Sequence, residues 1–198
     1  MLIVGVSAKL KCGKSTLCDH ITEMTKLKTK RFSFGRVIKK ETAEIFDVGI
    51  NVFYNDKDRV LTLPENIIVY DEMVTLPNGG VMTARKLLQW WGTDVRRKND
   101  PNYWIKESNI KINEYIQMGF EMILVDDMRF PNEMNLLEDK GGVTVRLREY
   151  DGYVVDDESK GHSSETALDN AMFDYVFCPE FGKLKETGQM LLEILESK

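Results

Sequence analysis

The chain has 198 residues, of which 42% are hydrophobic and 30% charged, a composition typical of one soluble globular domain. Its net charge of −5 argues against non-specific nucleic-acid binding, which needs a broad basic surface. No apolar run approaches the roughly 18 to 20 residues of a membrane span, and the amino terminus lacks a signal-peptide pattern, so we expect a cytoplasmic protein without a membrane partner. The three cysteines have no metal-ligand spacing and are expected to be reduced thiols.

The first third of the chain alternates between strand and helix signals. An apolar run at residues 2–6 predicts a strand, and apolar residues at helical spacing predict a helix from Lys14 to about residue 26. A short strand is predicted at 32–34 and a helix at 36–46. Residues 47–64 show no clear pattern.

The middle of the chain begins with a predicted strand at 67–70 and a turn at 77–80. Thr83 is a predicted amino-terminal cap for a helix that ends before Pro101. A second helix carries an apolar stripe and stops at Gly119.

The remaining strands are predicted at 122–125, 143–147 and 175–178, and a leucine-striped helix closes the chain. Strands that alternate with helices predict an α/β fold, in which helices cover both faces of a mostly parallel sheet in three layers.

A phosphate-binding loop is predicted between the first strand and the first helix. Gly13-Lys14-Ser15-Thr16 opens that helix, where backbone N–H groups and the positive end of the helix dipole attract phosphate oxygens. Lys14 is expected to reach the β- and γ-phosphates of ATP, and the Ser15 hydroxyl to bind Mg²⁺. The expected ATP-binding residues are Ala8, Lys9, Lys11, Cys12, Gly13, Lys14, Ser15 and Thr16.

This loop departs from the pattern GxxxxGK[ST] at one position, because Ala8 stands where the first glycine falls. An alanine there costs about 1 kcal/mol or more if the position requires a positive φ, and little if φ is negative. The alternative interpretation of residues 13–16 is a chance sequence at a helix cap. Cys12 is interpreted as a small residue that fits a tight turn.

Carboxylates follow the predicted strand at 122–125, at the edge where open α/β sheets bind ligands. Asp127, preferred over Asp126, is expected to hold Mg²⁺ or its water shell together with Ser15. Arg129 comes two residues later and can bind a phosphate through two parallel hydrogen bonds. The alternative is a solvated loop with a structural ion pair.

A predicted helix over residues 85–97 places Arg85, Gln89 and Arg96 roughly along one side. The arginines could bind the phosphate of an acceptor, and Gln89 or an aromatic face could bind its base. Without the phosphate loop, the same segment would be interpreted as an amphipathic helix. The basic run at 26–31 is interpreted as a solvated face.

Four segments in this order resemble the deoxynucleoside monophosphate kinases of bacteriophages. They are residues 13–16, residues 88–97 with Trp104 just beyond, residues 127–133 and residues 162–165. The resemblance spans residues 1 to about 170 and implies one domain with an adenylate-kinase-like P-loop fold. It implies a core over about 1–33, 109–145 and 166–198, an acceptor-binding insertion over about 34–108, and a lid over about 146–165.

The roles that we expect on this basis fall into three groups. Catalysis is assigned to Lys14, Asp127, Arg129, Arg146 and Arg148, the last two as lid arginines that neutralise charge on the transferring phosphoryl group. Metal binding is assigned to Ser15 and Asp127. Acceptor binding is assigned to Arg36, Lys39, Arg85, Gln89, Arg96, Trp104 and Arg129. For His162 and Glu165, a ligand contact and a helix-capping role both stay open.

The predicted reaction is transfer of the γ-phosphoryl group of ATP, with Mg²⁺, to a (deoxy)nucleoside monophosphate, which gives the diphosphate for DNA precursor synthesis. Because the acceptor phosphate is already ionised, we expect no catalytic triad. The alternatives are a kinase for another small molecule, such as dephospho-coenzyme A or a nucleoside, a nucleotide-dependent switch, and a degenerate binding module. Base and sugar specificity stay open, as does the choice between monomer and homodimer. A phage-encoded protein would act in the host cytoplasm.

Overall fold

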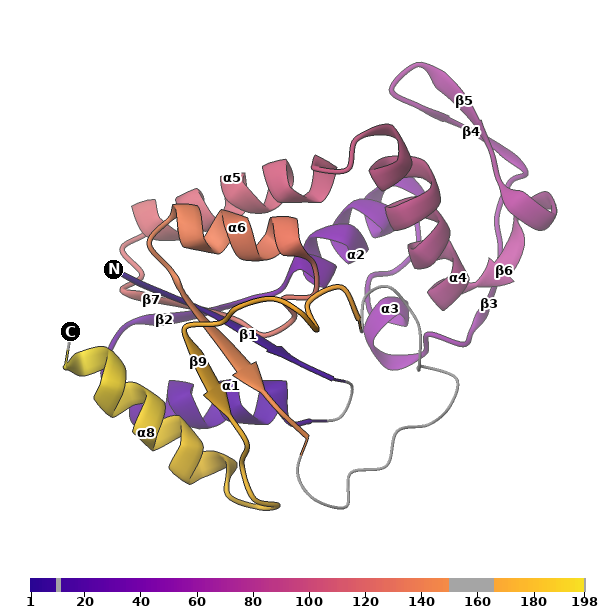
Figure 1. Ribbon diagram of the computed structural model, residues 1–198. Helices are drawn as coiled ribbons and strands as arrows, with labels where there is room; N and C mark the ends of the chain where they lie inside the picture. Colours follow the sequence, from indigo (N-terminus) through magenta and orange to yellow (C-terminus); the bar gives the residue numbers. More distant parts are fainter. Residues whose placement is uncertain (10–11, 150–165, 198) are drawn as a thin grey trace. The chain divides into compact units, whose positions relative to one another are not determined.

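The computed structural model describes residues 1–9, 12–149 and 166–197 (Figure 1). The chain forms two compact units. The first, which we call the core unit, comprises Met1–Phe34 and Ser108–Lys198, and the second, the insertion unit, comprises Gly35–Glu107. The insertion unit thus occupies the stretch for which the family resemblance implies acceptor binding, a role that stays a prediction.

The core unit contains a five-stranded sheet in the order β2-β7-β1-β8-β9. Its strands are β1 (Leu2–Ala8), β2 (Thr29–Phe32), β7 (Met122–Val125), β8 (Val143–Leu147) and β9 (Tyr175–Phe177). Every pair of neighbours in this sheet is parallel. The predicted α/β fold with a mostly parallel sheet is therefore confirmed.

Helices cover both faces of this sheet (Figure 1). Those of one face are α1 (Lys14–Met24) and α8 (Leu184–Glu196), and those of the other are α5 (Tyr103–Gln117) and α6 (Pro131–Asp139). Strands β1 and β7 lie side by side within the sheet, and both are largely buried: all four residues of β7 are buried, as are six of the seven residues of β1. That pattern is typical of parallel strands between two helix layers. On one face, Leu17 and Ile21 of α1 join Leu191 of α8 in a buried cluster against β1.

The insertion unit combines short helices with two small antiparallel ladders. The strand pairs are β3 (Val60–Thr62) with β6 (Val81–Thr83), and β4 (Asn66–Val69) with β5 (Glu72–Thr75). The helices are α2 (Phe34–Ile45), α3 (Val52–Asn55), the 3₁₀ turn η1 (Pro77–Gly80), α4 (Ala84–Gln89) and the π-helix η2 (Trp90–Arg97). Phe53, Leu87, Trp91 and Trp104 lie at the centre of its hydrophobic core.

Two local predictions differ from the structure. The strand predicted at 32–34 lies at 29–32 instead, because the backbone N–H of Phe34 donates a hydrogen bond to Asp127 and begins α2. The single helix predicted after Thr83 is divided into α4 and a π-helix, although Thr83 does cap α4 through a hydrogen bond from the Lys86 N–H.

The expected lid falls mostly outside the described residues, which omit 150–165 and with them His162 and Glu165. Arg146 lies in β8 and is part of the core sheet, so a lid that begins at about residue 146 would begin inside a strand. The extent of the lid stays a prediction. Within the described parts of the chain, no helix has both the length and the apolar character to span a membrane.

Replacing Gly79 or Gly80, which lie in the turn before β6, separates the energetic cost of a positive φ from the cost of a steric clash. Both have positive φ, 61° and 82°, but a Cβ on Gly80 would lie 2.1 Å from the carbonyl oxygen of Leu63, whereas one on Gly79 meets nothing within 4 Å. Gly79→Ala should cost about 1 kcal/mol of unfolding free energy. Gly80→Ala should cost at least about 2 kcal/mol more, because the backbone must also shift. Urea unfolding measures both values, and equal losses would contradict the clash.

Candidate active site

The described part of the loop between β1 and α1 ends at Gly13, directly before the helix. Gly13 caps the amino end of α1 in the left-handed conformation, with φ of 83°. A Cβ at this position would lie 2.4 Å from the Cδ1 atom of Leu184 on α8. The backbone conformation therefore favours glycine, and a Cβ would in addition force the tip of the Leu184 side chain to shift. Ser15 and Thr16 follow in the first turn of the helix, both exposed.

Ala8 does not strain the loop. It is the last residue of β1, and the described non-glycine residues with positive φ are Asp47, Tyr70, Asp71 and Asn78. An alanine in an extended strand has no steric penalty relative to its ordinary conformations. The departure from the glycine pattern therefore carries none of the conformational cost that a positive φ would have imposed.

The ammonium group of Lys14 lies against the loop itself. It donates hydrogen bonds to the backbone oxygens of Ala8, at 2.6 Å, and of Lys9, at 2.9 Å. Cys12 is buried in the same turn, and its N–H contacts the Lys9 oxygen at 3.4 Å. Lys11 lies outside the described residues. The loop thus presents its lysine at the carboxyl end of β1, the position from which a P-loop lysine reaches phosphates.

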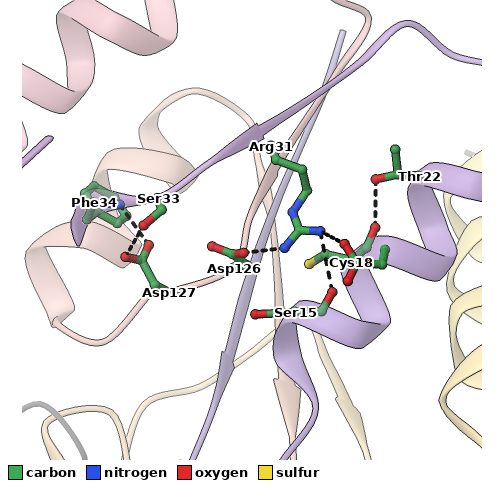
Figure 2. Close-up of polar contacts among 9 residues, drawn as sticks. Ser15, Cys18, Thr22, Arg31, Ser33, Phe34, Asp126 and Asp127 are labelled. Carbon is green, nitrogen blue, oxygen red and sulfur yellow. Dashed lines mark hydrogen bonds and ion pairs between the residues drawn. The ribbon is translucent and has the colours of Figure 1, made fainter. Parts of the chain in front are cut away.

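Asp126 follows β7 and is held by an arginine from the neighbouring strand (Figure 2). The guanidinium of Arg31 on β2 forms ion pairs with Asp126 and with Asp19 of α1, and donates a hydrogen bond to the backbone oxygen of Ser15 at 3.5 Å. Burial lowers the pKa of Arg31, but the hydrogen bond to Asp126 and the nearby acidic groups outweigh it and raise the pKa overall. Arg31 therefore stays charged and connects the end of β7 to the first turn of α1.

Burial also changes the pKa of Cys18, which lies near Arg31. Cys18 of α1 is fully buried, and its burial raises the pKa of the thiol to about 12, against a smaller opposing effect of Arg31. Cys18 is therefore a neutral thiol at physiological pH, which fits the predicted reduced state of the cysteines.

Asp127 points toward the start of α2, away from Arg31 (Figure 2). Its two oxygens accept hydrogen bonds from the Ser33 hydroxyl, at 2.7 Å, and from the Phe34 N–H, at 2.8 Å. The carboxylate that is tied to the first turn of α1 is Asp126, the one that the sequence did not favour. A metal role for Asp127 stays a prediction.

The turn that carries Arg129 is fixed by a buried acid. Glu133 is 2% exposed, and its carboxylate accepts hydrogen bonds from the backbone N–H groups of Arg129, at 2.8 Å, and of Phe130, at 3.1 Å. The carboxylate thereby satisfies two donors at the amino end of α6. Arg129 therefore leaves the sheet edge from a rigid turn.

Arg146 joins Lys9 on one carboxylate. Asp169 accepts hydrogen bonds from the Lys9 ammonium, at 2.6 Å, and from the Arg146 guanidinium, at 3.1 Å. Arg146 also donates to the Ser7 hydroxyl at 2.8 Å. Two cations thus lie beside the phosphate loop, held there by Asp169. Arg148 is exposed just after β8, and its N–H bonds to the Phe177 oxygen.

In the insertion unit, the predicted acceptor-binding residues lie in different environments. Arg36 and Gln89 are exposed, Arg85 pairs with Asp58 at 3.2 Å, and the Lys39 ammonium lies 4.0 Å from the ring centroid of Tyr54. These residues stay candidates for contact with a ligand.

Trp104 needs a correction. It is completely buried, and its indole N–H donates to the Gly92 oxygen at 2.9 Å. It packs in the core of the insertion unit and offers no surface to an acceptor.

Arg96 is largely enclosed, with 15% of its side chain exposed. It pairs with Glu41 at 2.8 Å.

Sequence reasoning did not find Glu41, Arg31 or Asp169. All three act through partners far away in the chain, so no local pattern marks them.

The sheet, the loop and its lysine define the class of P-loop nucleotide-binding proteins. The chain belongs, more specifically, to the deoxynucleotide monophosphate kinase family, whose model matches residues 45–180, more than half of the chain. The matched stretch includes Asp126, Arg129 and the π-helix, while the phosphate loop precedes it. The chain is also similar to the solved structure of shikimate kinase from Bacteroides thetaiotaomicron, at 12% identity, 98% coverage of both chains and a TM-score of 0.43. No curated protein matches the sequence significantly.

Replacing Arg31 tests whether it holds the site together. Arg31→Met would leave Asp126 and Asp19 without their shared cation, so the free energy of unfolding should fall by about 2 kcal/mol, less than for a fully buried pair. Lys26→Met removes an exposed positive charge near the end of α1 and should change stability by less than about 0.5 kcal/mol. Chemical denaturation measures both. A similar small loss in the two variants would show that the Arg31 ion pairs contribute nothing.

Proposed function

We propose that the protein transfers the γ-phosphoryl group of ATP to a deoxynucleoside monophosphate, with Mg²⁺, and so supplies diphosphates for DNA precursor synthesis. The observation that carries this proposal is the position of the Lys14 side chain, whose ammonium lies 2.6 Å from the backbone oxygen of Ala8 in the phosphate loop. Membership of the deoxynucleotide monophosphate kinase family supports the choice of acceptor.

On the ATP side, the loop binds phosphates through its backbone N–H groups and the positive end of α1. The Lys14 ammonium exchanges its two carbonyl partners for phosphate oxygens, which carry more negative charge. Gly13 supplies the left-handed turn before α1, a conformation that other residues adopt only at a cost. Lys9 and Arg146 add positive charge beside the loop.

The residues present also fit a magnesium ion. Mg²⁺ prefers oxygen ligands, keeps several waters and usually takes only one or two ligands from the protein besides the phosphates. The exposed Ser15 hydroxyl and the carboxylates after β7 are ligands of this kind, and Asp126 is the one linked through Arg31 to the turn that carries Ser15. When bound, the ion neutralises charge on the β- and γ-phosphates.

On the acceptor side, an oxygen of the monophosphate attacks the γ-phosphorus, and the bond to the β–γ bridging oxygen breaks, which leaves ADP. Arg129, held by its rigid turn, orients the attacking phosphate. Arg36, Lys39, Arg85, Gln89 and Arg96 of the insertion unit contribute phosphate or base contacts. Arg146 and Arg148 offset the charge that develops on the transferring group.

A panel assay tests the reaction. The full chain, with ATP and Mg²⁺, is given the common deoxy- and ribonucleoside monophosphates, and ADP release is followed in a coupled assay. We expect turnover with at least one deoxynucleoside monophosphate. Parallel reactions contain dephospho-coenzyme A and free nucleosides. Turnover with these alone would reassign the acceptor, and ATP hydrolysis without turnover of any acceptor would favour a nucleotide-dependent switch.

Lys14→Met tests the phosphate loop. Loss of a cation that contacts the transferring phosphoryl group should lower kcat by about 100-fold or more, with the thermal unfolding temperature little changed. Lys26→Met, which removes an exposed lysine beyond the end of α1, should keep the activity of the unaltered protein. Near-normal turnover by Lys14→Met would remove Lys14 from the mechanism.

A further inference from the structure

Glu41 is a largely enclosed acid on α2, and three side chains donate hydrogen bonds to its carboxylate. One oxygen, Oε1, accepts hydrogen bonds from the indole N–H of Trp91, at 2.9 Å, and from Nε of Arg96, at 2.8 Å. The other, Oε2, accepts a hydrogen bond from the Tyr103 hydroxyl at 2.6 Å. Only 14% of the Glu41 side chain is exposed. A buried carboxylate with both oxygens occupied cannot rotate without breaking a contact.

The π-helix brings two of these partners to the same side. Trp91 and Arg96 are five residues apart in η2, which has the i→i+5 hydrogen-bond pattern of a π-helix. In an α-helix, residues five apart point about 140° away from each other. One wider turn of the π-helix returns Arg96 to the side of Trp91, so that a single carboxylate oxygen receives both donors.

Aromatic rings hold the guanidinium of Arg96 in addition to Glu41. The centre of the guanidinium lies 4.5 Å from the ring centroids of Trp91 and Tyr103, and 5.1 Å from that of Tyr70. A planar cation against several rings is fixed in orientation as well as position. Burial, and then the hydrogen bond to Glu41, raises the pKa of Tyr103, so its hydroxyl stays protonated and keeps donating.

This arrangement uses only part of the donor capacity of Arg96. A guanidinium has five N–H donors, and the bond to Glu41 uses the one on Nε. The Nη2 atom is buried and has no hydrogen-bond partner among the described residues. An unsatisfied buried donor raises the free energy of the ligand-free site. A hydrogen bond from Nη2 to an oxygen of a ligand would remove that cost.

We infer that Glu41 is the positioning residue for Arg96, and that it sets the guanidinium in the orientation that binds the acceptor monophosphate. The inference rests on the proposed function. Glu41 itself touches no substrate and acts through Arg96. Because the arginine is oriented before the acceptor arrives, binding need not order a long flexible side chain.

A double-mutant cycle in the full chain tests this role. Glu41→Gln keeps the shape of the side chain and removes its charge, Arg96→Ala removes the residue that Glu41 positions, and the double variant combines them. The control is Glu44→Gln, the same change on an exposed residue of the same helix, whose carboxylate pairs with Lys40 at 3.6 Å. The readouts are the KM values for ATP and for the best deoxynucleoside monophosphate, kcat and the thermal unfolding temperature.

We expect Glu41→Gln to raise the KM for the acceptor by about tenfold and to leave the KM for ATP within about twofold. In the Arg96→Ala background, the same change should have no further effect on the acceptor KM, because residues that act through one another are not additive. Glu44→Gln should match the unaltered protein. A loss of stability alone would lower the amount of active protein without this selective change in KM.

Three results would overturn the inference. They are an unchanged acceptor KM in Glu41→Gln, an equal rise in both backgrounds, or an Arg96→Ala variant with an unchanged acceptor KM. If Glu41→Gln does not fold, Tyr103→Phe, which removes only the hydrogen bond to Oε2, takes its place in the cycle under the same criteria. An unaltered protein that phosphorylates no acceptor would instead refute the proposed function, and the positioning role with it.

Discussion

The strands of the core sheet all run in one direction, so each strand delivers the residues that follow it to the same edge. At that edge β1 continues into the phosphate loop, β7 into Asp126 and Asp127, and β2 into the start of α2. Arg31 and Asp127 then tie these strand ends together with ion pairs and hydrogen bonds. The backbone ladder sets the spacing of the groups, and the side chains only adjust their orientation.

Most of the sheet could be predicted, because a buried parallel strand leaves a local mark in the sequence. The apolar runs at β1 and β7 are of this kind, and both lie where they were expected. Strand β2 begins three residues and ends two residues earlier than predicted, and α2 begins at Phe34, whose N–H donates a hydrogen bond to Asp127, 93 positions later. The π-helix was not foreseen either. Two of its residues, Trp91 and Arg96, share Glu41, a partner that lies 50 and 55 positions earlier in the chain.

The candidate site divides in the same way. Lys14 could be identified from a short motif, because the loop needs glycine, lysine and serine in consecutive positions to do its chemistry. Arg31, Asp169 and Glu41 could not, since each is defined by partners that only the fold brings near. The run that ends at Arg31 was interpreted as a solvated face, yet Arg31 keeps only 28% of its side chain exposed. Trp104 shows the opposite error, because a residue expected at the ligand belongs to the core.

The contact between Gly13 and Leu184 links the two ends of the chain. The last helix closes the fold, and the tip of its first side chain occupies the space beside the phosphate-loop glycine that any larger residue would need. A bulkier side chain at the start of α8 would therefore press on the loop from behind. In a collection of variants selected for weakened ATP binding, substitutions at the carboxyl end of the protein should appear beside those in its first sixteen residues.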